Sequence, residues 1–467
     1  MNTIKTKTRK WITATFTSAL AMMCTSCDDF LSIEPPKTEI VSEVVFENEL
    51  SAKAALSGIY SMMMSTQSFT RAGLEEYTGI LSDEMINYST RAAQIQFHQN
   101  ALSAINTDVM SVFWRESFKY ILNANTIIEG VERSDALTQS AKNQLMGEAK
   151  FIRGYCYFHL INLFGDIPYL TSSDYRVNAV APRTPVGVVY NNIEQDLLEA
   201  RNLLKDDFSA SNGDRTQPNR GTATALLARL YLYTEQWEKA DQFASILIGD
   251  DTRYSLKEDL NSVFLANSSE AIWQLRPVIP GVNTPQGQLF ILSAAPNSTT
   301  RRVSLTPDLV DAFETDDTRR SHWVGTFSNA SGTWYYCHKY KVAVNPVVSE
   351  YSMIFRLAEQ FLIRAEARAN LDDLEGSRHN LNVIRNRAGL PDSPANDKAS
   401  ILAAIEQERR VELFAEGGHR WFDLKRTNRA NDILALLKVG WQPTDVLLPV
   451  PESERLLNPN LTQNDGY

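Results

Sequence analysis

Apolar residues recur every three or four positions along most of the chain, which is the spacing of one face of an α-helix. One such run covers residues 145–163, with apolar positions at Leu145, Ala149, Ile152, Cys156, Leu160 and Leu163. The segment GDIPY follows at 165–169, and a glycine with a proline just beyond it is typical of a helix end. The pattern therefore predicts a long helix that stops at Gly165.

Two further segments have the pattern of paired helices. Residues 221–248 alternate bulky positions such as Leu227, Tyr231 and Trp237 with small alanines, and this alternation over about 34 residues is typical of a tetratricopeptide hairpin. Residues 354–388 repeat the arrangement around the turn LDDLEG. We predict a mainly α fold in which tetratricopeptide-like hairpins form a right-handed scaffold, with further helices at 47–65, 108–131, 187–205 and 399–416.

Between residues 250 and 350 the helical pattern gives way to a segment in which Pro, Gly, Asn, Ser and Thr are frequent. Strand-like pieces occur at 271–278 and 334–342. We expect an irregular, loop-rich half with short strands, inserted on the helical frame. Binding surfaces usually lie on loops that a rigid scaffold holds, so this half is the expected place for a site.

The N-terminus has the layout of a bacterial secretory signal. Basic residues up to Lys10 precede an apolar segment from Trp11 to Met23, and small residues follow up to Cys27. The apolar segment is shorter than the about 20 residues of a membrane-spanning helix, so we expect cleavage after Ser26. Cys27 then becomes a lipidation site that anchors the chain; the alternative is an ordinary signal with an incidental cysteine. We predict a signal peptide at 1–26 and a lipidated tether at 27–45.

Composition and charge narrow the possible functions. The chain has 467 residues, of which 43% are hydrophobic, and its net charge is −10. A chain this acidic lacks the basic footprint of a nucleic-acid binder. Once the signal is removed and Cys27 is acylated, only Cys156 and Cys337 remain, which are too few for a disulfide scaffold. Cys156 lies in a helical apolar pattern and is expected to be a core residue.

Five stretches together resemble the SusD/RagB family, the nutrient-binding outer-membrane lipoproteins of Bacteroidetes-type uptake systems. They are CDDFLSIEPPKTE (27–39), FIRGYCYFHLINLFGDIPY (151–169), PRTPVGVVYNNIEQDLLEA (182–200), ERRVELFAEGGHRWFDLKR (408–426) and PESERLLNPNLTQNDGY (451–467). They occur in the family's order over essentially the whole mature chain. In the last stretch Asp465 stands where a proline is more usual.

The resemblance implies both an architecture and a role. It implies an N-terminal helical region at 46–250 and a C-terminal region at 251–467, loop-rich at 251–350 and helical at 351–430, within one compact unit. Proteins of this family are anchored in the outer membrane and face the cell exterior. They capture an oligosaccharide and deliver it to a SusC-like TonB-dependent transporter. By that resemblance the helical face contacts the transporter and the loop face meets the glycan, and no cofactor or metal is expected.

A row of glutamates raises an enzymatic alternative. Glu408, Glu412 and Glu416 would line one helix face, and glycoside hydrolysis needs two carboxylates at a fixed separation. Glu416 and His419 also form Glu-x-x-His, a ligand pair of di-iron bundles, but the sequence holds no second such motif. Charged groups inside proteins usually occur in pairs, so we favour a partly buried network of these glutamates with the nearby arginines Arg409, Arg410 and Arg420.

Sugar binding needs an exposed aromatic ring for the C–H face of a pyranose and polar groups for its hydroxyls. Two regions that we expect to be loops have this mixture, 83–100 and 281–336. Three aromatic residues, Tyr88, Trp323 and Trp334, stand among polar residues and rank first, although core packing is the alternative for each ring. The candidate ligand-binding residues are Tyr88, Arg91, Gln94, His98, Asn100, Phe290, Trp323, Trp334 and Tyr336.

The sequence therefore predicts a cell-surface glycan-binding lipoprotein without catalysis. Two alternatives stay open. One is a peptide-binding protein of the same uptake type, since tetratricopeptide grooves often hold peptides. The other is a glycoside hydrolase built on the glutamate row.

Overall fold

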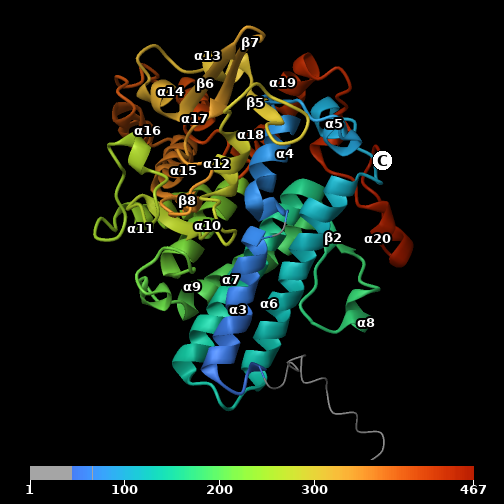
Figure 1. Cartoon of the computed structure of the whole chain (residues 1–467). Coiled ribbons are helices and arrows are strands. Elements are labelled where there is room, and N and C mark those ends of the chain that lie inside the picture. The colour runs from blue at the N-terminus through green and yellow to red at the C-terminus, as the bar shows by residue number, and fades with distance from the viewer. Residues whose placement is uncertain (1–44, 66) are drawn as a thin grey trace, which may run out of the picture. The chain divides into compact units, whose positions relative to one another are not determined.

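Helices dominate the chain (Figure 1), which confirms the mainly α fold and its helical hairpins. The computed structural model describes residues 45–65 and 67–467, so the predicted signal peptide, the predicted lipidation site Cys27 and nearly all of the tether lie outside the described residues. The longer helices are α3 Glu49–Ser65, α6 Glu116–Arg133, α7 Gln139–Phe164, α9 Val186–Leu203, α10 Arg220–Tyr233, α11 Trp237–Ile248, α15 Leu357–Asn370, α16 Leu374–Arg387 and α17 Lys398–Glu412.

Helix α7 is the helix that the apolar run at 145–163 predicts. It begins after Thr138, whose hydroxyl accepts a hydrogen bond from the Ala141 N–H at 3.3 Å. It ends at Gly165, where a φ of 72° breaks the helix. Its apolar positions are buried, Cys156 among them, and it packs between α6 and α9. The local pattern alone was sufficient to define this helix.

The predicted helix pairs at 221–248 and 354–388 correspond to the hairpins α10–α11 and α15–α16. The hairpins pack together through α11 and α15. Residues 354–356 belong to a strand rather than to the predicted helix, because they pair with residues 271–273. Helices α15, α16 and α17 pack on one another through a core of small and large apolar side chains. This core includes Ala358, Leu362, Ala365, Leu381, Ile384 and Ile405.

The loop-rich half contains short strands and short helices. Its main sheet is antiparallel, with the strand order β1-β5-β7-β6. The predicted strand at 334–342 ends at Cys337, whereas the predicted strand at 271–278 corresponds to β4. The strands are β1 Met85–Asn87, β2 Ile167–Pro168, β3 Arg183–Thr184, β4 Ala271–Leu275, β5 Val303–Leu305, β6 Val324–Asn329, β7 Gly332–Cys337 and β8 Ser352–Arg356.

Short helices connect the strands to the helical frame. One of them, η4 Val109–Arg115, is π-helical and leads into α6, whereas η3 Phe69–Gly73 is kinked at Arg71 and Ala72, whose backbone angles are not helical, and leads into the helix that begins at Leu74. The region 83–100, expected to be a loop, contains β1 and α5. The other short helices are α4 Leu74–Leu81, α5 Ala92–Gln99, α8 Tyr175–Asn178, α12 Pro285–Phe290, α13 Pro307–Asp311, α14 Thr318–Trp323, α18 His419–Arg426, α19 Ala430–Leu437 and α20 Glu452–Leu457, with 3₁₀ turns at η5 Ser209–Ser211, η6 Leu260–Ser262 and η7 Pro443–Val446.

Helix α17 ends at Glu412 and not at residue 416 as the pattern predicts. Ala415, Gly417 and Gly418 have positive φ angles, and successive left-handed residues cannot continue a right-handed helix. Glu416 therefore lies beyond the helix and does not share a helix face with Glu412.

Residues Phe46–Tyr467 form one compact unit. None of the helices within residues 45–65 and 67–467 is long and apolar enough to cross a bilayer. The boundaries predicted inside this unit remain predictions.

Candidate functional site

The four-stranded sheet brings together three of the predicted ligand-binding residues. Tyr88 follows β1, and Trp334 and Tyr336 lie on β7. Side chains alternate between the two faces of a strand, so the antiparallel register of β1, β5 and β7 places all three residues on one face. The Tyr88 hydroxyl lies 3.1 Å from Ser304 Oγ on that face. We call this surface the aromatic face; its three aromatic side chains are partly exposed.

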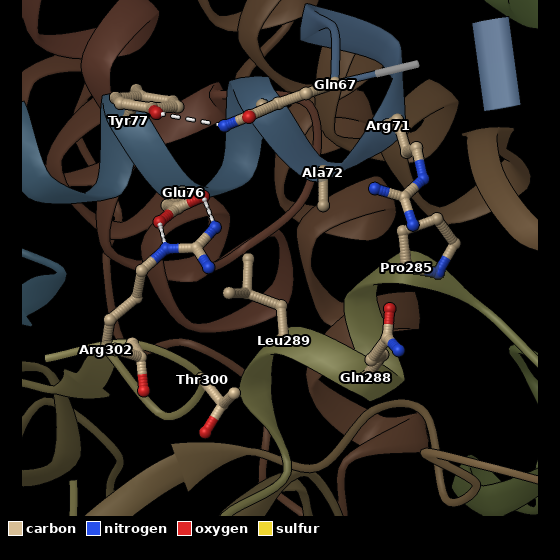
Figure 2. Close-up of a pocket in the computed structure, with 12 residues that line it drawn as sticks. Gln67, Arg71, Ala72, Glu76, Tyr77, Pro285, Gln288, Leu289, Thr300 and Arg302 are labelled. Carbon is tan, nitrogen blue, oxygen red and sulfur yellow. Dashed lines mark hydrogen bonds and ion pairs between the residues drawn. The ribbon is translucent and has the colours of Figure 1, made fainter. Parts of the chain in front are cut away.

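A hollow of about 400 Å³ lies between η3 and α4 on one side and α12 and the loop before β5 on the other (Figure 2). Its volume is within the range of about 300–1,000 Å³ that is usual for ligand pockets. It adjoins the aromatic face, because the Arg302 carbonyl accepts a hydrogen bond from the Tyr88 N–H at 2.8 Å. We call this hollow the arginine pocket; its lining includes Gln67, Arg71, Glu76, Leu289, Thr300 and Arg302.

One wall of the arginine pocket is fixed by an ion pair. Both carboxylate oxygens of Glu76 bind Arg302, with Arg302 Nη2 2.7 Å from Oε2. Gln94 Nε2 also donates to Glu76 Oε1 at 2.8 Å. Burial alone would lower the pKa of Arg302, but Glu76 raises it above the ordinary value. A two-point pair of this kind fixes orientation as well as charge, so this wall is rigid and its charges cancel.

A second set of contacts anchors Tyr77 at the pocket floor. The Tyr77 hydroxyl donates to Asp108 Oδ2 at 2.8 Å and accepts from Gln67 Nε2 at 3.3 Å. Burial and the nearby charges of Glu76 and Asp108 raise the pKa of Tyr77 well above its ordinary value, so the hydroxyl stays protonated. Arg91 Nη2 pairs with Asp108 Oδ1 at 2.6 Å. The predicted residue Arg91 thus supports Tyr77 through Asp108.

Arg71 lies opposite this ordered wall and is not paired. Within the described part of the chain, no group forms a hydrogen bond or ion pair with its side chain, and its Nε atom is buried. The next residue, Ala72, has a φ of 60°, a conformation that costs a non-glycine residue about 1–3 kcal/mol. Burial and the charge on Arg302 lower the pKa of Arg71 from its ordinary value. Sequence patterns gave no sign that Arg71 or Arg302 would line a pocket.

The structure buries two of the predicted aromatic contacts, which corrects the expectation that they are exposed. Trp323 has no exposed surface, and its indole N–H donates to the Leu260 carbonyl at 3.0 Å. Its polar sequence neighbours include Arg319, which belongs to a buried ion network and is not a surface residue. Phe290 ends α12 with its ring in the core. Neither ring can stack on a sugar in this arrangement.

Two predicted polar contacts are also buried. Gln94 holds Glu76 in place, and Asn100 ends α5 in a left-handed conformation with Nδ2 3.2 Å from the Leu81 carbonyl. His98 is half-buried and lines a different hollow. The predicted residues that keep exposed surface near the aromatic face or the arginine pocket are Tyr88, Arg91, Trp334 and Tyr336, and their contact with a glycan remains a prediction.

The glutamate row is part of a buried ion network. The fully buried Glu412 accepts hydrogen bonds from Arg356 at 2.5 Å, from Arg319 at 2.9 Å and from Arg387. Burial alone would raise its pKa, but the three arginines bring it well below the ordinary value. Glu412 is therefore a permanent carboxylate without access to solvent, and a substrate does not reach it.

The predicted buried network is confirmed, but its predicted partners are wrong. Glu408 pairs with Arg319, and Glu416 pairs with Arg356 and Lys339. The arginines near the row in sequence bind other acids: Arg409 binds Asp423, whereas Arg410 and Arg420 bind Asp83. Arg409 and Arg410 follow Glu408 by one and two positions on α17 and therefore point to other faces of that helix, whereas Arg420 lies on α18.

The Glu416–His419 pair does not form a metal site. Glu416 is engaged by Arg356 and Lys339, and His419 is buried with a pKa well below its ordinary value because of burial and the neighbouring Arg229. Across residues 45–65 and 67–467 no cluster of three or more His, Cys, Asp or Glu side chains is arranged to hold a metal ion.

Comparison with known proteins places this architecture. A family model described as "Starch-binding associating with outer membrane" matches residues 29–232, and the model of the "SusD family" matches residues 324–467. SusD-like protein P25 and SusD-like protein P2 of Formosa agariphila are 25% and 27% identical to the chain. Each alignment covers 96% of this chain, with 97% and 98% of the relative.

Solved structures share the fold. A SusD superfamily protein from Bacteroides vulgatus superposes with a TM-score of 0.78 at 20% identity, covering 90% of this chain and all of that chain. A structure titled "Laminarin binding SusD-like protein" superposes with a TM-score of 0.75 at 23% identity over the same shares. The family models, the full-length relatives and the shared fold agree, and the chain belongs to the SusD family.

Proposed function

We propose that this protein is a cell-surface lipoprotein, anchored through Cys27 in the outer membrane, that captures an oligosaccharide and delivers it to a SusC-like TonB-dependent transporter without catalysis. The observation that carries the proposal is the aromatic face joined to the arginine pocket, in a chain of the SusD family. The rings of Trp334 and Tyr336 are partly exposed there, and the adjoining pocket offers amide and hydroxyl groups.

These groups suit an oligosaccharide physically. Aromatic side chains lose little rotamer freedom on binding and cover the C–H face of a sugar ring. Gln67, Gln288 and Thr300 line the pocket with exposed polar side chains that can bind hydroxyls. The solved relative described as laminarin-binding supports the glycan class. The burial of Glu412 supports binding without hydrolysis, since the glutamate row cannot act on a bound sugar.

The segment around α8 is the surface we propose for the transporter. Tyr175, Val177 and Val180 are exposed by 77%, 59% and 56%, and grouped exposed apolar residues are typical of protein interaction sites. The segment is fixed to the helical half, because the Ser173 N–H donates to Glu129 on α6 at 2.8 Å.

Calorimetry against a panel of oligosaccharides, followed by chromatography of the mixtures, tests the proposal. We expect binding to at least one glycan and no cleavage product. Trp334→Ala should weaken binding by about tenfold, as expected from the loss of about 1–1.5 kcal/mol of ring contact, whereas Tyr175→Ala should leave glycan affinity unchanged. Binding to peptides alone, or the release of cleaved sugar, would contradict the proposal. A pull-down of the transporter with Tyr175→Ser should recover less of it than the wild type does.

A further inference from the structure

The arginine pocket carries one positive charge that the protein does not neutralise. Glu76 is fully engaged by Arg302. Glu75 stands four residues after Arg71, but its Oε1 atom accepts from Gln286 Nε2 at 3.2 Å. No carboxylate within the described ranges pairs with Arg71, and the charge that acts on its pKa is the positive charge of Arg302. A half-buried guanidinium without a partner is unfavourable in the free protein.

The geometry presents this charge to the hollow. Figure 2 shows the guanidinium groups of Arg71 and Arg302 on opposite sides of the pocket, with Leu289 between them. Gln288 on α12 and Thr300 in the loop before β5 lie below Leu289 in this view, and both side chains are exposed. The pocket therefore combines an unpaired cation, an apolar surface and hydroxyl-binding groups, which together fit a charged sugar better than a neutral one.

We propose that the arginine pocket binds an anionic group on the saccharide, a uronate carboxylate or a sulfate ester, through Arg71. The inference rests on the proposed glycan-binding function and names its substrate class. A guanidinium binds either group through two parallel N–H···O hydrogen bonds. Ala72, the residue after Arg71, has a left-handed φ of 60°, and strain of this kind clusters at binding sites.

Two pairs of polysaccharides that differ only in charge test the inference by calorimetry at 50 and 300 mM salt. The first pair is polygalacturonate and its carboxyl-reduced product, and the second is a sulfated galactan and its desulfated product. Neutral laminarin and starch complete the panel, and poly-glutamate serves as an acidic peptide. We expect one anionic member to bind at least about tenfold more tightly than its neutral partner, as a charge-assisted hydrogen bond contributes about 1.5–3 kcal/mol. The preference should shrink at high salt.

Arg71→Gln should remove that preference while leaving the protein folded, because the Arg71 side chain has no hydrogen-bond or ion-pair partner among residues 45–65 and 67–467. Arg71→Lys should keep part of the preference. Arg176→Gln is the matched control, since it removes the same charge from an exposed arginine on α8. The pair that responds identifies the anion as carboxylate or sulfate.

Three results would overturn the inference. One is equal affinity of the wild type for both members of each pair. Another is an unchanged preference in Arg71→Gln. The third is binding to neutral glycans or poly-glutamate in place of anionic glycans. Binding to neutral glycans alone would leave the proposed function intact, whereas binding to no saccharide would refute both. If Arg71→Gln does not fold, the wild type still tests the inference, because equal affinity for the charged and the neutral member of each pair would refute it.

Discussion

Replacing Glu412 by Gln tests the conclusion that the glutamate row is structural. Glu412 accepts from Arg356 and Arg387 on Oε1 and from Arg319 on Oε2. A glutamine keeps the shape, but its NH₂ group must face at least one of these donors, and the carboxylate charge is lost. Breaking a buried ion pair from one side costs about 3–5 kcal/mol. We therefore expect the free energy of unfolding of Glu412→Gln to fall by that amount.

The size of the accompanying shift in Tm follows from the size of the folded unit. Unfolding entropy is about 2.1 cal/mol/K per residue, so a unit of roughly 420 residues changes stability by about 0.9 kcal/mol per degree near Tm. Glu412→Gln should then melt about 3–6 °C below the wild type. Glu314→Gln is the matched control, because Glu314 is 47% exposed and its partner, the buried Arg385 at 2.5 Å, keeps Glu408 as a second partner at 3.5 Å. Loss of a carboxylate this exposed is expected to cost about 1 kcal/mol or less.

Urea unfolding and thermal melting at pH 7 measure the free energy of unfolding and the Tm of the wild type and of both variants. Because arginines lower the pKa of Glu412 below 4.5 in the folded state, its contribution is complete above pH 4.5 and decreases as the pH falls through the folded-state pKa. The difference in free energy of unfolding between the wild type and Glu412→Gln should therefore become smaller at acidic pH. A loss no larger than that of Glu314→Gln, or hydrolysis of a glycan by the wild type that Glu412→Gln abolishes, would refute the structural role.

Three other predictions address the binding surface, the core and the anchor. A side chain at Gly325 would overlap the Tyr336 ring, so Gly325→Ala should displace this partly exposed ring and lower glycan affinity with little change in stability, whereas Gly187→Ala, in open space on α9, should gain about 0.4–1 kcal/mol of stability. Burial raises the pKa of Glu148 to about 7, so the wild type loses stability as the pH rises from 4.5 to 7. Glu148→Gln should therefore be more stable than the wild type at pH 8, by up to about 3 kcal/mol, and equally stable at pH 4.5. Urea midpoints at the two pH values measure this difference. Cys27→Ser should leave the protein without a lipid anchor, and fractionation with mass spectrometry should find it unacylated and released from membranes.

Helices were predictable because their signals are local. The period of apolar positions in α7 and the alternation of bulky and small residues in α10–α11 depend on neighbours within a few turns. The predicted end of α17 was wrong, because that end depends on left-handed residues after Glu412, and no hydrophobic period reveals them.

The binding surface was predictable only in part, because exposure is set by contacts distant in sequence. Trp334 and Tyr336 are partly exposed, as expected, and the sheet register places Tyr88 on the same face. Trp323 has equally polar neighbours, but one of them, Arg319, belongs to the buried network, and Lys339 lies 4.9 Å from its ring centre. A polar sequence neighbourhood therefore has two explanations, a surface loop or a buried ion network, and the sequence does not distinguish them.

Arg71 shows why the pocket itself could not be found from the sequence. In a continuous helix, Arg71 and Glu75 would be four residues apart and would form an ordinary surface ion pair, in which their charges cancel. The left-handed Ala72 breaks the helix between them, and Glu75 turns to Gln286. The partner of Glu76 is Arg302, which lies 226 positions away. The unpaired charge in the pocket therefore arises from a local break in the helix combined with a long-range ion pair, and it becomes visible only when both are seen together.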